Sequence, residues 1–119
     1  MAGAVSKNFS SPDETRPFKA NGQLEVVNIG DSTVAKGTFG PGWKWSNDVK
    51  PIAGTDLCQA AHLIYMVSGK MVVQMADGSE SEMAPGDVVS IEPGHDAWVV
   101  GDEPCVSIEM QAVGYAKQS

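Results

Sequence analysis

Apolar and polar residues alternate in short runs along most of the chain, and residues typical of turns separate these runs. β-branched and aromatic residues are concentrated in the runs, whereas glycine, proline and aspartate lie between them. This combination is typical of antiparallel strands joined by tight turns. The segments expected to form strands are LEVVNIG (24–30), STVAKGTFG (32–40), HLIYMVSG (62–69), KMVVQMADG (70–78), DVVSIEPG (87–94), AWVVGDEP (97–104) and CVSIEMQAV (105–113).

The turn signals are evenly spaced in the second half of the chain. Four two-residue signals follow one another at intervals of eight or nine residues: Ser68-Gly69, Asp77-Gly78, Pro85-Gly86 and Pro93-Gly94. No segment carries apolar residues at the i, i+3, i+4, i+7 spacing over three turns together with helix caps. The sequence therefore predicts an all-β domain, a sandwich or a barrel, with little helix.

The first 20 residues have a different character. They are polar, include Pro12 and Pro17, and have too few apolar residues to form a core of their own. We expect residues 1–20 to form an arm that is ordered by packing on the domain or on a second subunit. Residues 21–119 are expected to form the single domain that is normal for a chain of 119 residues.

The charge of the chain excludes two classes of partner. Eight basic and 15 acidic residues give a formal net charge of −7, so the chain lacks the basic surface that binds nucleic acids or anionic membranes. Its apolar runs are shorter than the ~20 residues that span a bilayer, and its N-terminus lacks the pattern of a signal peptide. We therefore expect a cytoplasmic protein whose partners are small molecules, metal cations or other proteins.

The chain contains two cysteines, Cys58 and Cys105. In a reducing compartment, such a pair is more consistent with buried free thiols than with a disulfide. We therefore expect both side chains to be reduced and buried.

The stretch HLIYMVSGKMVVQMADGSESEMAPGDVVSIEPGHDAW combines a strand ending in YMVSG, a hairpin at DG and a PGD turn. In this order and spacing these features resemble the cupin superfamily, whose motifs are G-x5-H-x-H-x3,4-E-x6-G and G-x5-P-x-G-x2-H-x3-N. The resemblance spans about residues 22–113, and the chain looks most like small single-domain cupins of unassigned function that carry PGHDAWVVGDEP. It implies a double-stranded β-helix, the jelly-roll barrel of the cupins.

The metal ligands of the two cupin motifs are not kept in this chain. In the first motif, Asp48 and Lys50 stand where the two histidines are expected, and His62 stands at the place of the glutamate, after a longer insertion. In the second motif, Ala97 replaces the usual histidine and His95 comes two residues earlier. Metal binding therefore has to be argued from the donors that remain.

The donors that remain near those positions form a candidate metal site. His62, His95 and Asp48 would supply two imidazoles and one carboxylate, the ligand set that holds Fe(II) in facial triads and also suits Mn, Zn or Ni. Cys58, four residues before His62, would supply a soft fourth donor if the intervening segment bends. A barrel mouth would provide the cavity that keeps coordination positions open. His62 and His95 are also the candidate catalytic residues.

The three tryptophans are the second candidate feature. Trp43 and Trp45 share one face if the segment GWKWS is extended, because side chains alternate along a strand. Trp98 follows His95 in the second motif. We expect Trp43, Trp45 and Trp98 to line a substrate pocket.

Three functions remain open. The first is a small-molecule-binding cupin that holds a divalent ion through His62, His95 and either Asp48 or Cys58 and acts on a small organic substrate. The second is a metal-free binding or sensing module whose barrel forms the pocket. The third is a metal-free acid–base enzyme in which His95, with Asp96 or His62, moves a proton.

The N-terminal arm and the need to cover an edge strand also predict a homodimer.

Overall fold

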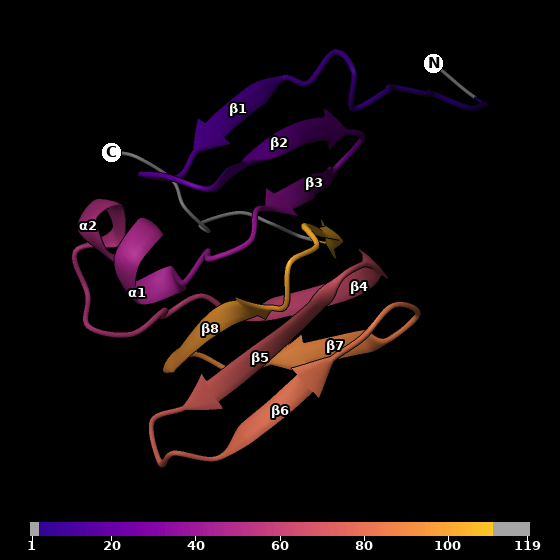
Figure 1. Cartoon of the computed structure of the whole chain (residues 1–119). Helices are drawn as coiled ribbons and strands as arrows, with labels where there is room; N and C mark the ends of the chain where they lie inside the picture. The colour runs from indigo at the N-terminus through magenta and orange to yellow at the C-terminus, as the bar shows by residue number, and fades with distance from the viewer. Residues whose placement is uncertain (1–2, 111–119) are drawn as a thin grey trace.

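The computed structural model describes residues 3–110, which form two antiparallel sheets and two short helices (Figure 1). The larger sheet has the strand order β1-β2-β3-β9-β4-β7, and the smaller has the order β6-β5-β8. The strands are β1 (Glu14–Pro17), β2 (Gly22–Ile29), β3 (Ser32–Phe39), β4 (His62–Ser68), β5 (Lys70–Met75), β6 (Glu80–Met83), β7 (Val88–Ile91), β8 (His95–Val100) and β9 (Cys105–Met110). The helices are α1 (Trp45–Asp48) and α2 (Lys50–Ala53), and no helix among the described residues is long and apolar enough to cross a membrane. The predicted all-β class is confirmed.

All seven predicted strands are present as β2 to β5 and β7 to β9, with β6 lying between them. Residues 111–113 of the last predicted segment lie outside the described residues. β6 was not predicted, because only Met83 is buried in its sequence ESEM and no apolar alternation marks it. It forms by pairing with β5 across the Asp77-Gly78 turn, so its strand conformation is imposed by its neighbour.

The end of the predicted N-terminal arm belongs to the larger sheet. β1 pairs with β2 in antiparallel register, and Phe18 follows it into the core. The ring of Phe18 lies 5.4 Å from that of Phe39 and 5.6 Å from that of Trp43. The arm therefore contributes an edge strand and one aromatic core residue to the domain.

The segment GWKWS is extended only at Lys44 and becomes helical at Trp45, which corrects the expectation that Trp43 and Trp45 alternate along a strand. The N–H of Asp48 donates to the carbonyl of Lys44 (2.9 Å), and the Asp48 carboxylate accepts from the N–H of Lys44 (3.0 Å). These two bonds close a helical turn, so α1 begins at Trp45. Both tryptophans are nevertheless buried, because the turn folds against the core.

Alternation along β4 separates an inner from an outer face. His62, Ile64 and Met66 are buried, whereas Leu63 and Tyr65 are each 42% exposed. Antiparallel sheets commonly bury one face only. The first residue of β4 thereby places an imidazole in the space between the two sheets.

Candidate metal centre

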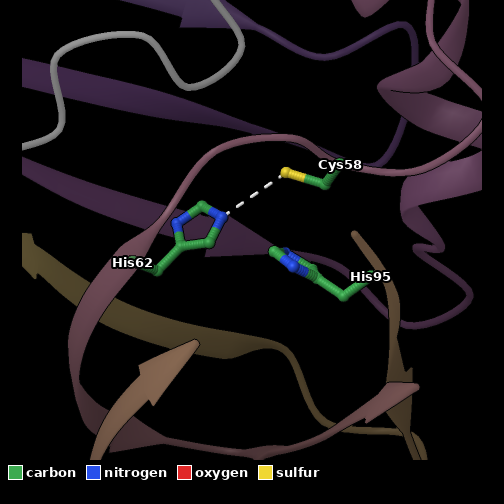
Figure 2. Close-up of side chains that lie close together, drawn as sticks. All are labelled: Cys58, His62 and His95. Atoms are coloured by element: carbon green, nitrogen blue, oxygen red, sulfur yellow. Dashed lines mark hydrogen bonds between the residues drawn. The ribbon is translucent and has the colours of Figure 1, made fainter. Parts of the chain in front are cut away.

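Three buried donor side chains meet in the core. Cys58, His62 and His95 each offer one ligand atom, and these atoms lie within 4.8 Å of one another. Figure 2 shows the sulfur of Cys58 and the two imidazole rings converging on one region from three segments of the chain. Within residues 3–110, no other histidine, cysteine or acidic side chains form such a group.

Backbone hydrogen bonds hold Cys58 against the start of β8. The N–H of Cys58 donates to the carbonyl of His95 (2.8 Å), and the N–H of Gly94 donates to the carbonyl of Cys58 (2.7 Å). Gly94 has a φ of +95°, a conformation that favours glycine because a side chain would be strained there. The Pro93-Gly94 turn therefore brings His95 next to Cys58.

His62 is held from the neighbouring strand. Its Nδ1–H donates to Oε1 of Glu109 on β9, and both side chains are buried. The strand register explains this contact, because β4 pairs with β9 and Ile64 lies opposite Glu109. Nε2 of His62 is then directed to the other side of the ring, where the sulfur of Cys58 lies 3.5 Å away.

His95 has the same arrangement with a different acceptor. Its Nδ1–H donates to the backbone carbonyl of Glu92 (2.7 Å). A carbonyl oxygen only accepts, so Nδ1 carries a proton, and Nε2 is the ring nitrogen left for another partner. Metal-binding histidines are usually held in this way, with the second ring nitrogen bonded to a carbonyl or carboxylate. The rings of His62 and His95 lie 5.1 Å apart and cross at 67°.

The charges of these groups depend on one another. Burial by itself raises the pKa of Cys58, but hydrogen bonds to His62 and His95 and the charge of His62 outweigh it and lower the pKa to about 6. Burial by itself lowers the pKa of His62, but Cys58 and Glu109 raise it to about 9. In the metal-free protein at neutral pH, Cys58 is therefore a thiolate and His62 an imidazolium. A divalent cation would displace the proton on Nε2 of His62.

A small cavity adjoins the donors. Its volume is about 30 Å³, and its lining includes Trp43, Trp45, His62, His95 and Glu109. This space holds about two water molecules, far less than the ~300 to 1,000 Å³ of a typical small-molecule site. Side chains therefore fill the barrel, which argues against the hypothesis that its interior is a metal-free binding pocket.

Three polar atoms beside this cavity are buried without a hydrogen-bond partner among the described residues. They are Nε1 of Trp43, Nε1 of Trp45 and Oε2 of Glu109. Buried polar groups are nearly always paired. Water or a small polar ligand in the cavity would supply acceptors for the two indole N–H groups and a donor for the carboxylate.

Asp48 does not join the group of donors. Its carboxylate accepts from the N–H of Lys44 (3.0 Å) and from Nδ2 of Asn21 (3.5 Å), so it stabilises the turn that begins α1. Of the two alternatives for the third ligand, the structure brings Cys58 to the histidines and leaves Asp48 away from them.

Only two of the three tryptophans that were expected to line a pocket do so. Trp43 and Trp45 line the inner cavity, whereas Trp98 does not. The ammonium group of Lys44 lies 5.2 Å from the centre of the Trp98 ring, so this ring takes part in a cation–π contact. Asp96 also lies apart from the histidine chemistry, because its carboxylate accepts from the N–H groups of Ser46 and Ala97.

Glu109 is the site residue that sequence reasoning missed. In CVSIEM, alternation places Cys105, Ser107 and Glu109 on the buried face of β9. A glutamate at a buried position of an apolar strand was the available signal, because a buried carboxylate requires a partner. Its partner, His62, lies 47 residues earlier in the chain.

Solved structures identify the fold. A cupin-like protein from Thermotoga maritima matches with a TM-score of 0.56 and 20% identity, over 85% of this chain and 75% of that protein. A cupin domain from Bordetella pertussis Tohama I matches with a TM-score of 0.54 and 15% identity, over 78% of this chain and 94% of that domain. This chain has the cupin fold.

The cupin fold leaves the function to be argued from the site. A protein of unknown function from Acidithiobacillus ferrooxidans has a TM-score of 0.60 and 16% identity, over 82% of this chain and 86% of that protein. No protein-family model matches the chain, and no curated protein matches its sequence. The predicted cupin-type jelly roll is confirmed, and the chemistry rests on the residues of this chain.

Proposed function

We propose that this cupin barrel holds one divalent metal ion through the sulfur of Cys58 and the Nε2 atoms of His62 and His95. One observation carries the proposal: three buried donors converge, and an acceptor engages Nδ1 of each histidine. This second layer of hydrogen bonds is what fixes the orientation of metal-binding imidazoles.

The spacing of two donors suits zinc. Tetrahedral coordination with Zn–S of ~2.3 Å and Zn–N of ~2.0 to 2.1 Å places the sulfur and nitrogen about 3.5 Å apart. The distance from Sγ of Cys58 to Nε2 of His62 is 3.5 Å. A thiolate among the ligands also favours Zn²⁺ over ions that prefer carboxylates, such as Mn²⁺. Among Fe, Mn, Zn and Ni, we therefore infer zinc.

Three protein ligands leave one position open, which is the composition of catalytic zinc sites. When bound, the ion would act as a Lewis acid and lower the pKa of a coordinated water to ~7. Glu109 holds His62 through Oε1, and its Oε2 lines the same cavity and would accept a proton there. The indole N–H groups of Trp43 and Trp45 would donate to an oxygen of the bound molecule. We infer a metal-dependent reaction on a small organic substrate.

The test is the metal content of protein purified without an affinity tag. We expect about one zinc ion per chain in the wild type and a large loss in Cys58→Ser, His62→Gln and His95→Gln. Cys105→Ser is the matched control, because it removes the other buried thiol. A wild type with less than about one ion per ten chains after reconstitution would contradict the proposal.

Two contacts favour a second function for this site. Cys58, His62 and Glu109 stand in the order of a nucleophile, a base and a residue that orients the base. Without metal, this arrangement would support covalent catalysis by the thiolate. It differs from the predicted acid–base site, in which His95 acts with Asp96 or His62. Activity that survives a chelator but is abolished by Cys58→Ser would favour this metal-free function. Activity that is lost with the chelator and restored by added zinc would exclude it.

We also propose that the chain forms a homodimer through the outer face of β4 and β7. Leu63, Tyr65, Val67 and Val88 are between 42% and 68% exposed there, and such apolar patches usually mark interfaces. Sedimentation should give about twice the chain mass, and Val88→Glu should give a monomer. Val5→Glu, which places the same charge on the exposed arm, should leave the dimer intact. A monomeric wild type at micromolar concentration would contradict the dimer.

A further inference from the structure

A second, larger hollow lies where the edges of the two sheets face each other. β6 and β7 are edge strands of the smaller and larger sheets, and they lie near each other in the lower part of Figure 1. The cleft has a volume of about 300 Å³, ten times that of the inner cavity. Its lining residues come from β5, β6, β7 and the residue after β7: Val73, Met75, Ser81, Val89, Ser90, Ile91 and Glu92.

This cleft borders the candidate metal centre. Val73 and Ile91 line both the cleft and the inner cavity, so their side chains form the partition between the two spaces. Ile91 lies opposite His62 in the pairing of β7 with β4. The carbonyl of Glu92, another residue of the cleft, accepts the hydrogen bond from Nδ1 of His95.

Strand pairing also places residues of the cleft directly beside the two histidines. Met75, at the edge of the cleft, lies opposite His95 in the pairing of β5 with β8. Residues of the cleft are therefore register partners of both histidines. A molecule in the cleft is separated from the donors by the side chains of Val73 and Ile91, which are 4% and 7% exposed.

We propose that the cleft is the substrate site of this centre, that it binds a small amine with an apolar body, and that Ile91 and Val73 separate the cleft from the metal ligands. The proposal rests on the proposed function, because it assigns the substrate class and the route of entry for the same centre. The inner cavity is too small for an organic molecule of this size, so the body of the substrate lies outside and only its reacting group passes the partition.

The lining of the cleft determines the class of ligand. Val73, Met75, Val89 and Ile91 offer apolar surface for the body of the molecule, and Ser81, which lies opposite Val73 in the pairing of β5 with β6, offers a hydroxyl. Glu92 is the one charged residue in the lining, and the chain carries a formal net charge of −7. A cationic amine is therefore attracted, whereas a carboxylate would meet like charge.

Benzylamine and benzoate are the probes for the ligand class, because they share a ring and differ in the sign of the charge. In amide NMR titrations of wild-type protein, benzylamine should shift Ser81, Ser90 and Glu92 and bind at least about tenfold more tightly than benzoate. Glu92→Gln should remove most of that preference. Equal binding of the two probes, or shifts outside the cleft, would overturn the assignment.

Alkylation of Cys58 by iodoacetamide tests the route in metal-free protein that carries Cys105→Ser. Ile91→Ala should raise the alkylation rate at least about tenfold over the Ile64→Ala control. Ile64 is an isoleucine of similar burial that lines the inner cavity but not the cleft. Ile91→Val, which removes only one methyl group, should give a smaller increase in the same direction if Ile91→Ala folds poorly. Equal rates in the Ile91 and Ile64 variants would overturn the route.

The failure of the cleft proposal and the failure of the metal proposal give different results. Metal content is measured on the same preparations before chelation. Zinc-free wild-type protein with a fast Ile91→Ala reaction would end the proposed metal function and keep the cleft as the entrance to Cys58. Zinc-containing protein with equal alkylation rates in the two variants would keep the metal and end the entrance.

Discussion

The two cysteines of this chain are equally buried and chemically opposite. Cys58 is 3% exposed and Cys105 is 0% exposed, and both are free, as the sequence predicted. The pKa of Cys58 is lowered to about 6, whereas burial raises the pKa of Cys105 to about 11. Cys58 lies beside two imidazoles, whereas the thiol of Cys105 donates to the carbonyl of Lys70 (3.0 Å). Burial alone therefore does not set the reactivity of a thiol, and the neighbouring charges do.

The surroundings of Cys105 explain its structural role. Gly69, at the turn between β4 and β5, has a φ of +76°, and a Cβ there would lie 2.7 Å from the sulfur of Cys105. The sulfur thus fills the space that the glycine leaves. Cys105 packs a turn, whereas Cys58 is held by backbone bonds with its sulfur turned to His62.

The largest expected difference is in thiolate content. At pH 7, pKa values of about 6 and about 11 correspond to roughly 90% thiolate for Cys58 and roughly 0.01% for Cys105. Ultraviolet titration of metal-free Cys105→Ser and Cys58→Ser, each with one remaining thiol, measures the two values. His62→Gln should raise the pKa of Cys58 strongly, because burial remains and the positive charge is lost. Similar pKa values for the two thiols would break the comparison.

The next difference is in metal affinity. Cys58→Ser should weaken zinc binding by more than about 100-fold, because losing a ligand lowers the affinity more than losing a residue that only hydrogen-bonds to a ligand. Cys105→Ser should leave the affinity unchanged. Competition with a chromophoric chelator measures both, and equal losses would show that the thiols matter only for folding.

Removing the hydrogen-bond partner of His62 should weaken zinc binding less than removing a ligand does. Glu109→Gln keeps the shape of the side chain but removes the charge that holds Nδ1 of His62. We expect a loss of about 10- to 100-fold in zinc affinity and a lower pKa for His62. Glu92→Gln is the control, because the His95 bond goes to its backbone carbonyl. If Glu109→Gln binds zinc as tightly as the wild type, Glu109 does not support the metal ligands.

The smallest effect is on the pH dependence of stability in the metal-free protein. The lowered pKa of Cys58 contributes stability that is present above 9.0 and lost as the pH falls through about 6. The raised pKa of His62 contributes stability that is present below 6.5 and lost as the pH rises through about 9. Between these values the two slopes cancel, because the folded and unfolded pairs bind the same number of protons.

Removing Cys58 should reveal the pH dependence of stability that His62 contributes. In Cys58→Ser, His62 keeps Glu109 as its partner, so stability should fall as the pH rises through the pKa of His62. The wild type should show little change over the same range. Urea midpoints between about pH 6 and pH 9 measure this difference, and parallel curves for the two proteins would contradict the coupling.

The strands and the donor histidines were predictable because their signals are local. Alternation and turns that contain glycine mark β2 to β5 and β7 to β9, and the near-match to two motifs points to His62 and His95. β6 and α1 were not predictable, because β6 forms by pairing with β5, and local hydrogen bonds to Asp48 override the alternation of two tryptophans.

The sequence by itself determined an all-β cupin fold, a negative charge and two imidazoles available for chemistry. Only the tertiary structure decided that Cys58 rather than Asp48 completes the donor set, that Glu109 supports His62, and that the two thiols differ. The physical reason is that pKa values and metal sites depend on distances between groups remote in sequence. Those distances follow from the pairing of β4 with β9 and from the hydrogen bonds between Cys58 and the start of β8.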